Sequence, residues 1–199
     1  MEQIEINKTI KLSEHYTLGE MTKTSTGMMN IPSRVSIENM KRVCGWLEAL
    51  RCRYNQRYVL GGSSSSPKLG EDRRGLNERQ VSPSSDHPAH PGTPPDSGGE
   101  KDTEEPIIIS SGYRSPEVNR RVGGSATSNH LTGCAVDIRV AGIEQALRYA
   151  VILMDYADET RQDYDELLIE RNRSGRYWVH FAVRPPKSQN RRKTAMLSV

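Results

Sequence analysis

Two histidines and one aspartate, divided between two segments of the chain, have the residue types and spacing best suited to chemistry. His130 and Asp137 lie in the segment 128–137, and His180 follows about forty residues later. Two imidazoles and one carboxylate offer three ligands to a divalent metal ion. Structural zinc sites are closed by four protein ligands, whereas catalytic sites keep one position open. The residue set therefore predicts a catalytic Zn²⁺ site.

The residues around these candidates alternate between apolar and polar, as in strands. Val136 and Ile138 would face one side of a strand and Asp137 the other. Trp178 and His180 would likewise share one face of a second strand. Singly, each candidate also fits an ordinary role: a histidine that caps a turn, an aspartate on an exposed strand, or a histidine between strands. Together they favour a metal site.

Three motifs, in order along the chain, resemble the zinc D-Ala-D-Ala carboxypeptidase family. They are Ser111-Gly112-Tyr113-Arg114, then Ser128-x-His130-x-x-Gly133-x-Ala135-x-Asp137, and then Trp178-x-His180. The family also contains vancomycin-resistance dipeptidases and phage endolysins, and it shares its fold with the hedgehog signalling domain. The chain is most similar to its short phage and prophage members, from about Leu12 to Pro185 apart from one insertion.

The resemblance implies an α+β fold, with a small antiparallel sheet flanked by helices as in hedgehog and DD-peptidase domains. It implies that His130, Asp137 and His180 bind Zn²⁺. The implied activity is zinc-dependent hydrolysis of a D-amino-acid-containing bond in peptidoglycan stem peptides, either as a carboxypeptidase or as an endolysin-like endopeptidase. The alternative is a catalytically silent zinc-binding module of the same fold.

Hydrolysis needs a general base, and the usual position for it is occupied by another residue. Several relatives carry an acid three residues before the last histidine, where this chain has Tyr177. A three-residue hairpin loop at 173–175, with glycine last, would place Glu170 opposite Trp178 and on the face of His180. Phage-type relatives also carry a glutamate in this strand. We therefore expect Glu170 to act as general base and acid.

Three open points concern this expectation. A two-residue loop would turn Glu170 away, and Glu170 could also be a surface carboxylate paired with Arg171 or Arg176. Asp165 and Glu166 are weaker candidates for the base.

Arg114 and Ser128 match residues that relatives place at the substrate. A guanidinium can stabilise a tetrahedral oxyanion or bind a substrate carboxylate with two hydrogen bonds. Arg114 could instead pair with Glu117 or Asp137, and Ser128 could cap a turn. The expected roles are catalysis and substrate binding for Arg114, and substrate binding for Ser128.

Helices and strands that could hold these residues follow from periodicity and capping signals. Apolar residues recur at helical spacing from Met40 to Tyr54, with Ser36 as expected N-cap, and from Ile143 to Ala157. Residues 107–109 predict a buried strand. Ser115-Pro116 begins a short helix that Gly123-Gly124 ends.

We divide the chain into four parts. Residues 1–60 and 106–186 form the catalytic domain, and 187–199 form a basic tail, either solvated or a short closing strand. Residues 61–105 are rich in Gly, Ser, Pro and charge, so we expect a disordered insertion in a surface loop. His87 and His90 within it lie beside prolines without a fixed carboxylate pair, so we expect no second metal site there.

Composition limits the partners. The net charge of +3 suits an anionic cell-wall polymer, and the chain lacks any nucleic-acid-binding motif. We expect peptidoglycan peptides as partners, no nucleic acid, no membrane and a monomer. The N-terminus has no signal-peptide pattern and no apolar run is long enough to span a membrane. Synthesis in the bacterial cytoplasm, with action on the wall after release, is the expected route.

Three cysteines, Cys44, Cys52 and Cys134, form no disulfide framework, and strand alternation turns Cys134 away from Asp137. The sequence leaves open which peptidoglycan bond is cut, and from which end.

Overall fold

The computed structural model describes residues 7–60 and 103–199, and its centre is a five-stranded sheet. The strands lie in the order β1-β2-β4-β3-β5 and pair antiparallel, except that β3 and β5 are parallel. Their bounds are Ile109–Ser111 (β1), Ala135–Arg139 (β2), Glu166–Arg171 (β3), Tyr177–Ala182 (β4) and Lys193–Ser198 (β5). The α+β fold predicted from the sequence is confirmed.

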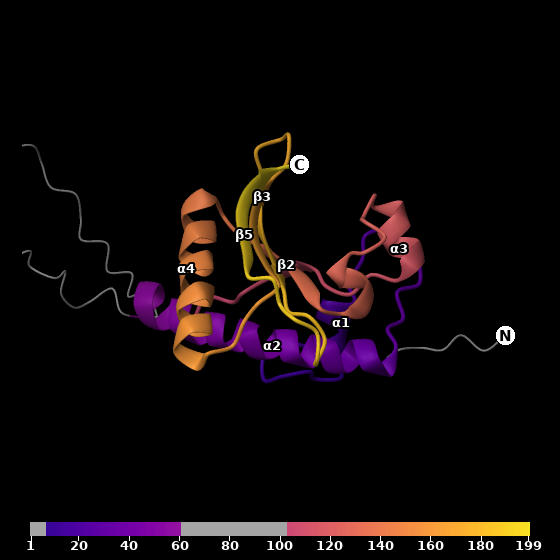
Figure 1. The fold of residues 1–199 in the computed structure, drawn as a ribbon, viewed down its shortest axis with the longest axis horizontal. Helices are drawn as coiled ribbons and strands as arrows, with labels where there is room; N and C mark the ends of the chain where they lie inside the picture. The colour runs from indigo at the N-terminus through magenta and orange to yellow at the C-terminus, as the bar shows by residue number, and fades with distance from the viewer. Residues whose placement is uncertain (1–6, 61–102) are drawn as a thin grey trace, which may run out of the picture.

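Helices flank this sheet (Figure 1). The two long ones are α2, Arg34–Tyr54, which continues as a π-helical turn at Asn55–Val59, and α4, Ile143–Thr160. Figure 1 shows α4 on one side of the sheet and α3 (Pro116–Arg121) on the other, while α2 runs across below. Two short elements complete the set: α1 at Leu18–Met21 and a 3₁₀ turn, η2, at Asn129–Thr132.

The two faces of the sheet differ because side chains alternate along each strand. The core face carries fully buried apolar residues, among them Ile138, Val179 and Phe181. Trp46 of α2 lies with its ring centroid 5.1 Å from that of Phe181, so α2 covers this face. The opposite face carries Asp137 and His180, which are directly paired across β2 and β4. One face therefore stabilises the fold and leaves the other for chemistry.

Most predicted helix ends are confirmed, and one is wrong. Ser115 caps α3 with Pro116 as its first residue, and Gly123 follows with φ of 74°. The predicted N-cap of α2, Ser36, lies inside the helix. Ser33 is the cap, because its side chain accepts the backbone N–H of Ser36.

The C-terminal tail forms β5, which pairs with β3. Of the two predicted forms of the tail, a solvated segment or a short closing strand, the structure has the strand. Most of the predicted insertion, 61–102, and the two histidines within it lie outside the described residues. Within the ranges that the structure covers, no helix has the length and apolar character needed to cross a membrane.

Candidate metal centre

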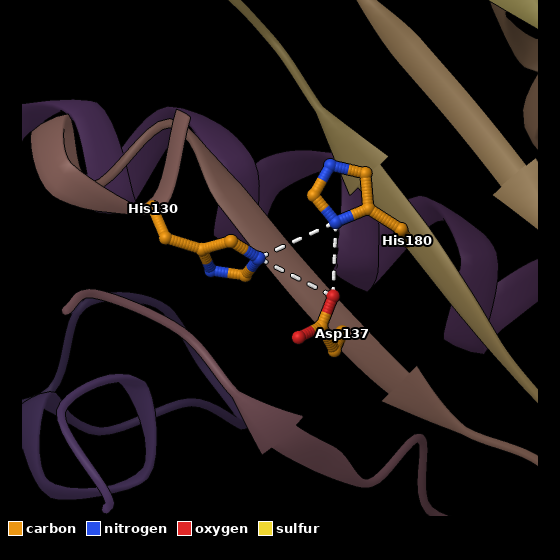
Figure 2. A group of neighbouring side chains, drawn as sticks. All are labelled: His130, Asp137 and His180. Carbon is orange, nitrogen blue, oxygen red and sulfur yellow. Dashed lines mark hydrogen bonds and ion pairs between the residues drawn. The ribbon is translucent and has the colours of Figure 1, made fainter. Parts of the chain in front are cut away.

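The three predicted ligands converge on one point (Figure 2). Nε2 of His130 lies 3.3 Å from Nδ1 of His180 and 3.3 Å from Oδ1 of Asp137. Nδ1 of His180 and Oδ1 of Asp137 are 2.9 Å apart. His130 comes from η2, Asp137 from β2 and His180 from β4. One donor atom from each residue thus points into the same small space, which Figure 2 shows.

This arrangement fits zinc. Zinc–nitrogen bonds of about 2.0–2.1 Å and tetrahedral angles place neighbouring ligand atoms about 3.3–3.4 Å apart. Two of the three separations are 3.3 Å, and the third is a hydrogen bond of 2.9 Å. Two nitrogens and one carboxylate oxygen are also a donor set that zinc prefers. These residues are the only group of three or more potential ligands found among the residues described.

A backbone carbonyl orients His130. Its Nδ1 lies 2.6 Å from the carbonyl oxygen of Gly112, which can only accept a hydrogen bond. Nδ1 must therefore carry the proton, and Nε2 keeps its lone pair toward Asp137 and His180. With 2% of its surface exposed, His130 has little freedom to turn away.

Arg114 orients Asp137. Its Nη2 donates to Oδ2 of Asp137 at 2.5 Å, and its Nε donates to Ser111 Oγ at 2.9 Å. The pairing with Asp137 considered from the sequence is thus present, whereas the pairing with Glu117 is formed by Arg120 instead. Because Arg114 occupies Oδ2, Asp137 turns only Oδ1 toward the two histidines.

Glu166 lies behind His180. Its Oε2 is 3.6 Å from Nε2 of His180, the nitrogen opposite the one that faces Asp137. A carboxylate at the outer nitrogen of a metal-ligating histidine fixes its ring and tautomer. From the sequence, Glu166 was a candidate only for the general base. Side chains alternate along β3, so Glu166, Leu168 and Glu170 share the face of His180. This alternation is the sequence feature from which the position of Glu166 could have been predicted.

The carboxylates around the histidines shift several pKa values. Burial alone would lower the pKa of His180, but hydrogen bonds with Asp137 and Glu166 raise it to about 9. Burial would raise the pKa of Asp137, but the two imidazoles hold it well below its usual range. The contact with His180, followed by Arg191 and Lys193, lowers the pKa of Glu166 to about 2. Both acids therefore stay ionised, whereas a metal ion that binds Nδ1 of His180 must displace the proton held there by Asp137.

A tight turn joins the first two ligands. Gly133 has φ of 72°, and a Cβ there would lie 2.4 Å from the carbonyl oxygen of Ser36 in α2. Only glycine can adopt this backbone conformation so close to α2 without strain. The contact places η2, and with it His130, against the long helix before the chain enters β2.

Glu170 occupies the predicted register. It pairs with Trp178, and the loop at 173–175 ends in Gly175 with φ of 82°. The three-residue loop is confirmed, and the two-residue alternative is wrong. Nε1 of Trp178 donates to Oε2 of Glu170 at 2.6 Å. Glu170 is a diagonal neighbour of His180 on the same face, at a typical Cα separation of about 7–8 Å.

Ser128, Asp165 and Cys134, the other residues considered from the sequence, contact the surrounding fold and are not part of the group of three ligands. Ser128 caps η2 by accepting the backbone N–H of His130 at 3.3 Å. Asp165 is fully buried and accepts hydrogen bonds from Arg191 and from Asn129 at 2.9 Å, and it pairs with Arg184 at 2.8 Å. Cys134 is buried and outside the ligand group, and all three cysteines are free.

Asp165 is a residue whose importance the sequence did not reveal. It ties the residues before β5 to Asn129, the neighbour of His130. Its partners Arg184 and Arg191 lie 19 and 26 positions away along the chain, so no local pattern pointed to this network.

One family comparison bears on this centre. Residues 100–165 match the family described as Peptidase M15. This segment includes β1, α3, His130 and Asp137, and it ends before His180. No curated protein matches the chain. Peptidases of the M15 family depend on zinc, which agrees with the donor set described above. This match covers only the segment 100–165 of the chain, and it confirms the resemblance to zinc peptidases of this family that was drawn from the sequence.

Proposed function

We propose that the chain is a zinc-dependent peptidase that hydrolyses a D-amino-acid-containing bond in peptidoglycan stem peptides. The observation that carries the proposal is the convergence of His130, Asp137 and His180, whose donor atoms lie within 3.3 Å of one another. The family match supports the same chemistry. Three protein ligands leave room in a tetrahedral site for the reacting groups.

His130, Asp137 and His180 would hold the ion. When bound, zinc supplies a Lewis acid that polarises the scissile carbonyl and makes water more acidic. The protein fixes the orientation of the ligands through one further contact to each. These contacts join Gly112 to His130, Arg114 to Asp137 and Glu166 to His180. Such fixed outer contacts lower the cost of assembling the site.

Glu170 is the proposed general base and acid. It takes a proton from the attacking water and returns it to the leaving amine. Of the two glutamates on this face, Glu166 already contacts His180 and Asn129 through Oε2, and Arg191 and Lys193 through Oε1. Glu170 receives one hydrogen bond, from Trp178. Glu170 is therefore the better proton carrier.

Arg114 and Ser128 are proposed to contact the substrate in addition to their structural roles. Arg114 lies beside Asp137 with part of its guanidinium engaged there, and its other N–H groups can donate to a substrate carbonyl or carboxylate. The hydroxyl of Ser128, at the start of η2, is partly exposed beside His130. Ser128 would bind the substrate, and Arg114 would both bind it and stabilise the tetrahedral oxyanion.

One observation favours a second candidate, a silent zinc-binding module of the same fold. The position three residues before His180 is Tyr177, not an acid, and Glu170 is held by Trp178. If Glu170 stays with Trp178 when a peptide binds, the site keeps zinc but lacks a base.

Zinc-loaded protein incubated with purified muropeptides, with products identified by mass, tests both candidates. We expect loss of a terminal residue or cleavage within the stem, and the product masses identify the bond. His180→Ala should lose both zinc and activity, while His15→Ala, which removes an exposed histidine outside the site, should keep both. Retention of zinc and full activity in His180→Ala contradicts the proposal. A zinc-loaded wild type that cuts no muropeptide supports the silent module.

A further inference from the structure

A pocket of about 820 Å³ lies where β2 ends and β4 begins, and no role assigned so far uses it. Three basic residues, Lys23, Arg139 and Arg176, line it together with three aromatic residues, Tyr149, Tyr177 and Trp178. One acid, Glu105, also lines it. Basic and aromatic groups around one cavity can hold an anionic organic ligand.

Two of the lining residues, Arg139 and Trp178, stand one row of side chains from the metal ligands. Arg139 follows Asp137 by two residues on β2, and Trp178 precedes His180 by two residues on β4, so all four share a face. Arg139 and Trp178 are also direct partners in the sheet. Two residues along a strand span about 7 Å. A peptide cut at the metal centre and extended along this face therefore reaches Arg139 and Trp178 of the pocket with its next one or two residues.

Positive charge in the pocket is not neutralised by neighbours. Within residues 7–60 and 103–199, Lys23, Arg139 and Arg176 form no ion pair, although many other basic residues there do. The carboxylate of Glu105 already accepts a hydrogen bond from Gln145 at 2.7 Å. Three basic residues against one acid leave the lining with an excess of positive charge, which favours an anion.

Trp178 connects the pocket with the proposed base. Its ring lines the pocket, and its Nε1 donates to Glu170. A ligand that contacts this ring also approaches the one group that holds Glu170 in place. Trp178 thus belongs both to the lining of the pocket and to the surroundings of the proposed base.

We infer that this pocket is a substrate subsite that binds a free carboxylate of the peptide, one or two residues from the bond that is cut. The inference rests on the proposed function for the identity of the peptide. A guanidinium from Arg139 or Arg176 can hold the carboxylate with two hydrogen bonds, and Trp178 can cover the adjoining carbon chain. The subsite selects peptides with acidic side chains over amidated ones.

Equilibrium binding separates this inference from hydrolysis. The probes are a peptidoglycan stem tetrapeptide with free side-chain carboxylates and the same tetrapeptide with those carboxylates amidated, titrated by calorimetry into zinc-loaded protein. We expect wild type to bind the free acid at least about tenfold more tightly, as for a charge-assisted contact. In Arg139→Gln with Arg176→Gln the ratio of the two affinities should fall toward one, with zinc content unchanged.

Lys41→Gln is the matched control. It removes an exposed cation of α2 that does not line the pocket, and it should leave the affinity ratio at its wild-type value. Equal affinity of wild type for both peptides, or an unchanged ratio in the double variant, overturns the inference even if muropeptides are cut. Selective binding without hydrolysis supports the subsite and counts against the proposed peptidase activity instead.

Discussion

Oε2 of Glu166 lies 3.6 Å from Nε2 of His180, on the side of the imidazole that faces away from Asp137. His180 is therefore held between two carboxylates, one on each ring nitrogen. The two glutamates of β3 differ in this respect: Glu166 contacts a metal ligand, whereas Glu170 contacts Trp178. The same strand thus supplies a positioning residue and the proposed base, and substitution can separate them.

Glu166→Gln should weaken zinc binding. Loss of the carboxylate behind a ligating histidine typically costs about 10-fold to 100-fold in metal affinity. Competition with a chromogenic chelator measures the change. Glu170→Gln is the matched control, since it alters a neighbouring glutamate of the same strand without a contact to a ligand atom, and its zinc affinity should match wild type. Wild-type affinity in Glu166→Gln contradicts the positioning role.

Glu170→Gln should keep zinc and lose turnover. A general base contributes about 10²–10⁴-fold to the rate, so kcat should fall by that factor while KM changes little. Steady-state kinetics on the cleaved muropeptide, with zinc content measured on the same sample, gives the answer. If kcat stays within a few-fold of wild type, another group is the base.

Zinc removal should lower thermal stability without unfolding the protein. The core face of the sheet packs against α2 independently of the site, so the metal-free protein should remain folded. Free zinc at about 1,000 times Kd stabilises by about 4 kcal/mol, or roughly 10 °C in Tm. Circular dichroism melts with chelator and with zinc measure this shift. His130→Ala should show almost none of it, and an equal shift there would place the ion elsewhere.

Gly133→Ala should destabilise the protein by about 1–3 kcal/mol. The substitution forces a left-handed backbone on alanine and places a Cβ 2.4 Å from the carbonyl oxygen of Ser36. Gly45→Ala is the control, because Gly45 lies within α2 and a Cβ added there would meet no atom within 4 Å. Helix propensity predicts that this control is stabilised by about 0.5–1 kcal/mol. Urea unfolding compares the two, and equal effects contradict the explanation.

Asp165→Asn should change how the free energy of unfolding depends on pH. Burial alone raises the pKa of Asp165, but hydrogen bonds from Arg191, Asn129 and Arg184 outweigh it and hold the pKa well below its usual range. A pKa lower in the folded than in the unfolded state stabilises above about pH 4, and this stability is lost as the pH falls below that value.

The variant should lose about 3 kcal/mol at pH 7, because it leaves two arginines without their buried partner. Between about pH 5 and pH 3 it should lose less stability than wild type does. Denaturant unfolding at several pH values checks both parts, and parallel pH profiles of the two proteins would contradict them.

Local patterns were enough to predict the strands around the ligands. Alternation placed Asp137 opposite Val136 and Ile138, and the glycine at 175 selected the loop that pairs Glu170 with Trp178. These features depend on a period of two and on a single left-handed residue, both of which are visible in a short stretch of chain. The N-cap of α2 was harder to predict because two serines, Ser33 and Ser36, stand close together there.

By itself the sequence determined the ligand set and the faces on which the ligands lie, because residue type and alternation are local properties. Only the tertiary structure decided which neighbours hold those ligands: Arg114 at Asp137, Glu166 at His180 and Gly112 at His130. It also decided that the tail pairs with β3 and that basic residues gather around a pocket where β2 ends and β4 begins. The reason is physical, since each of these contacts joins segments that are brought together only when the strands pair and the core face is buried against the helices.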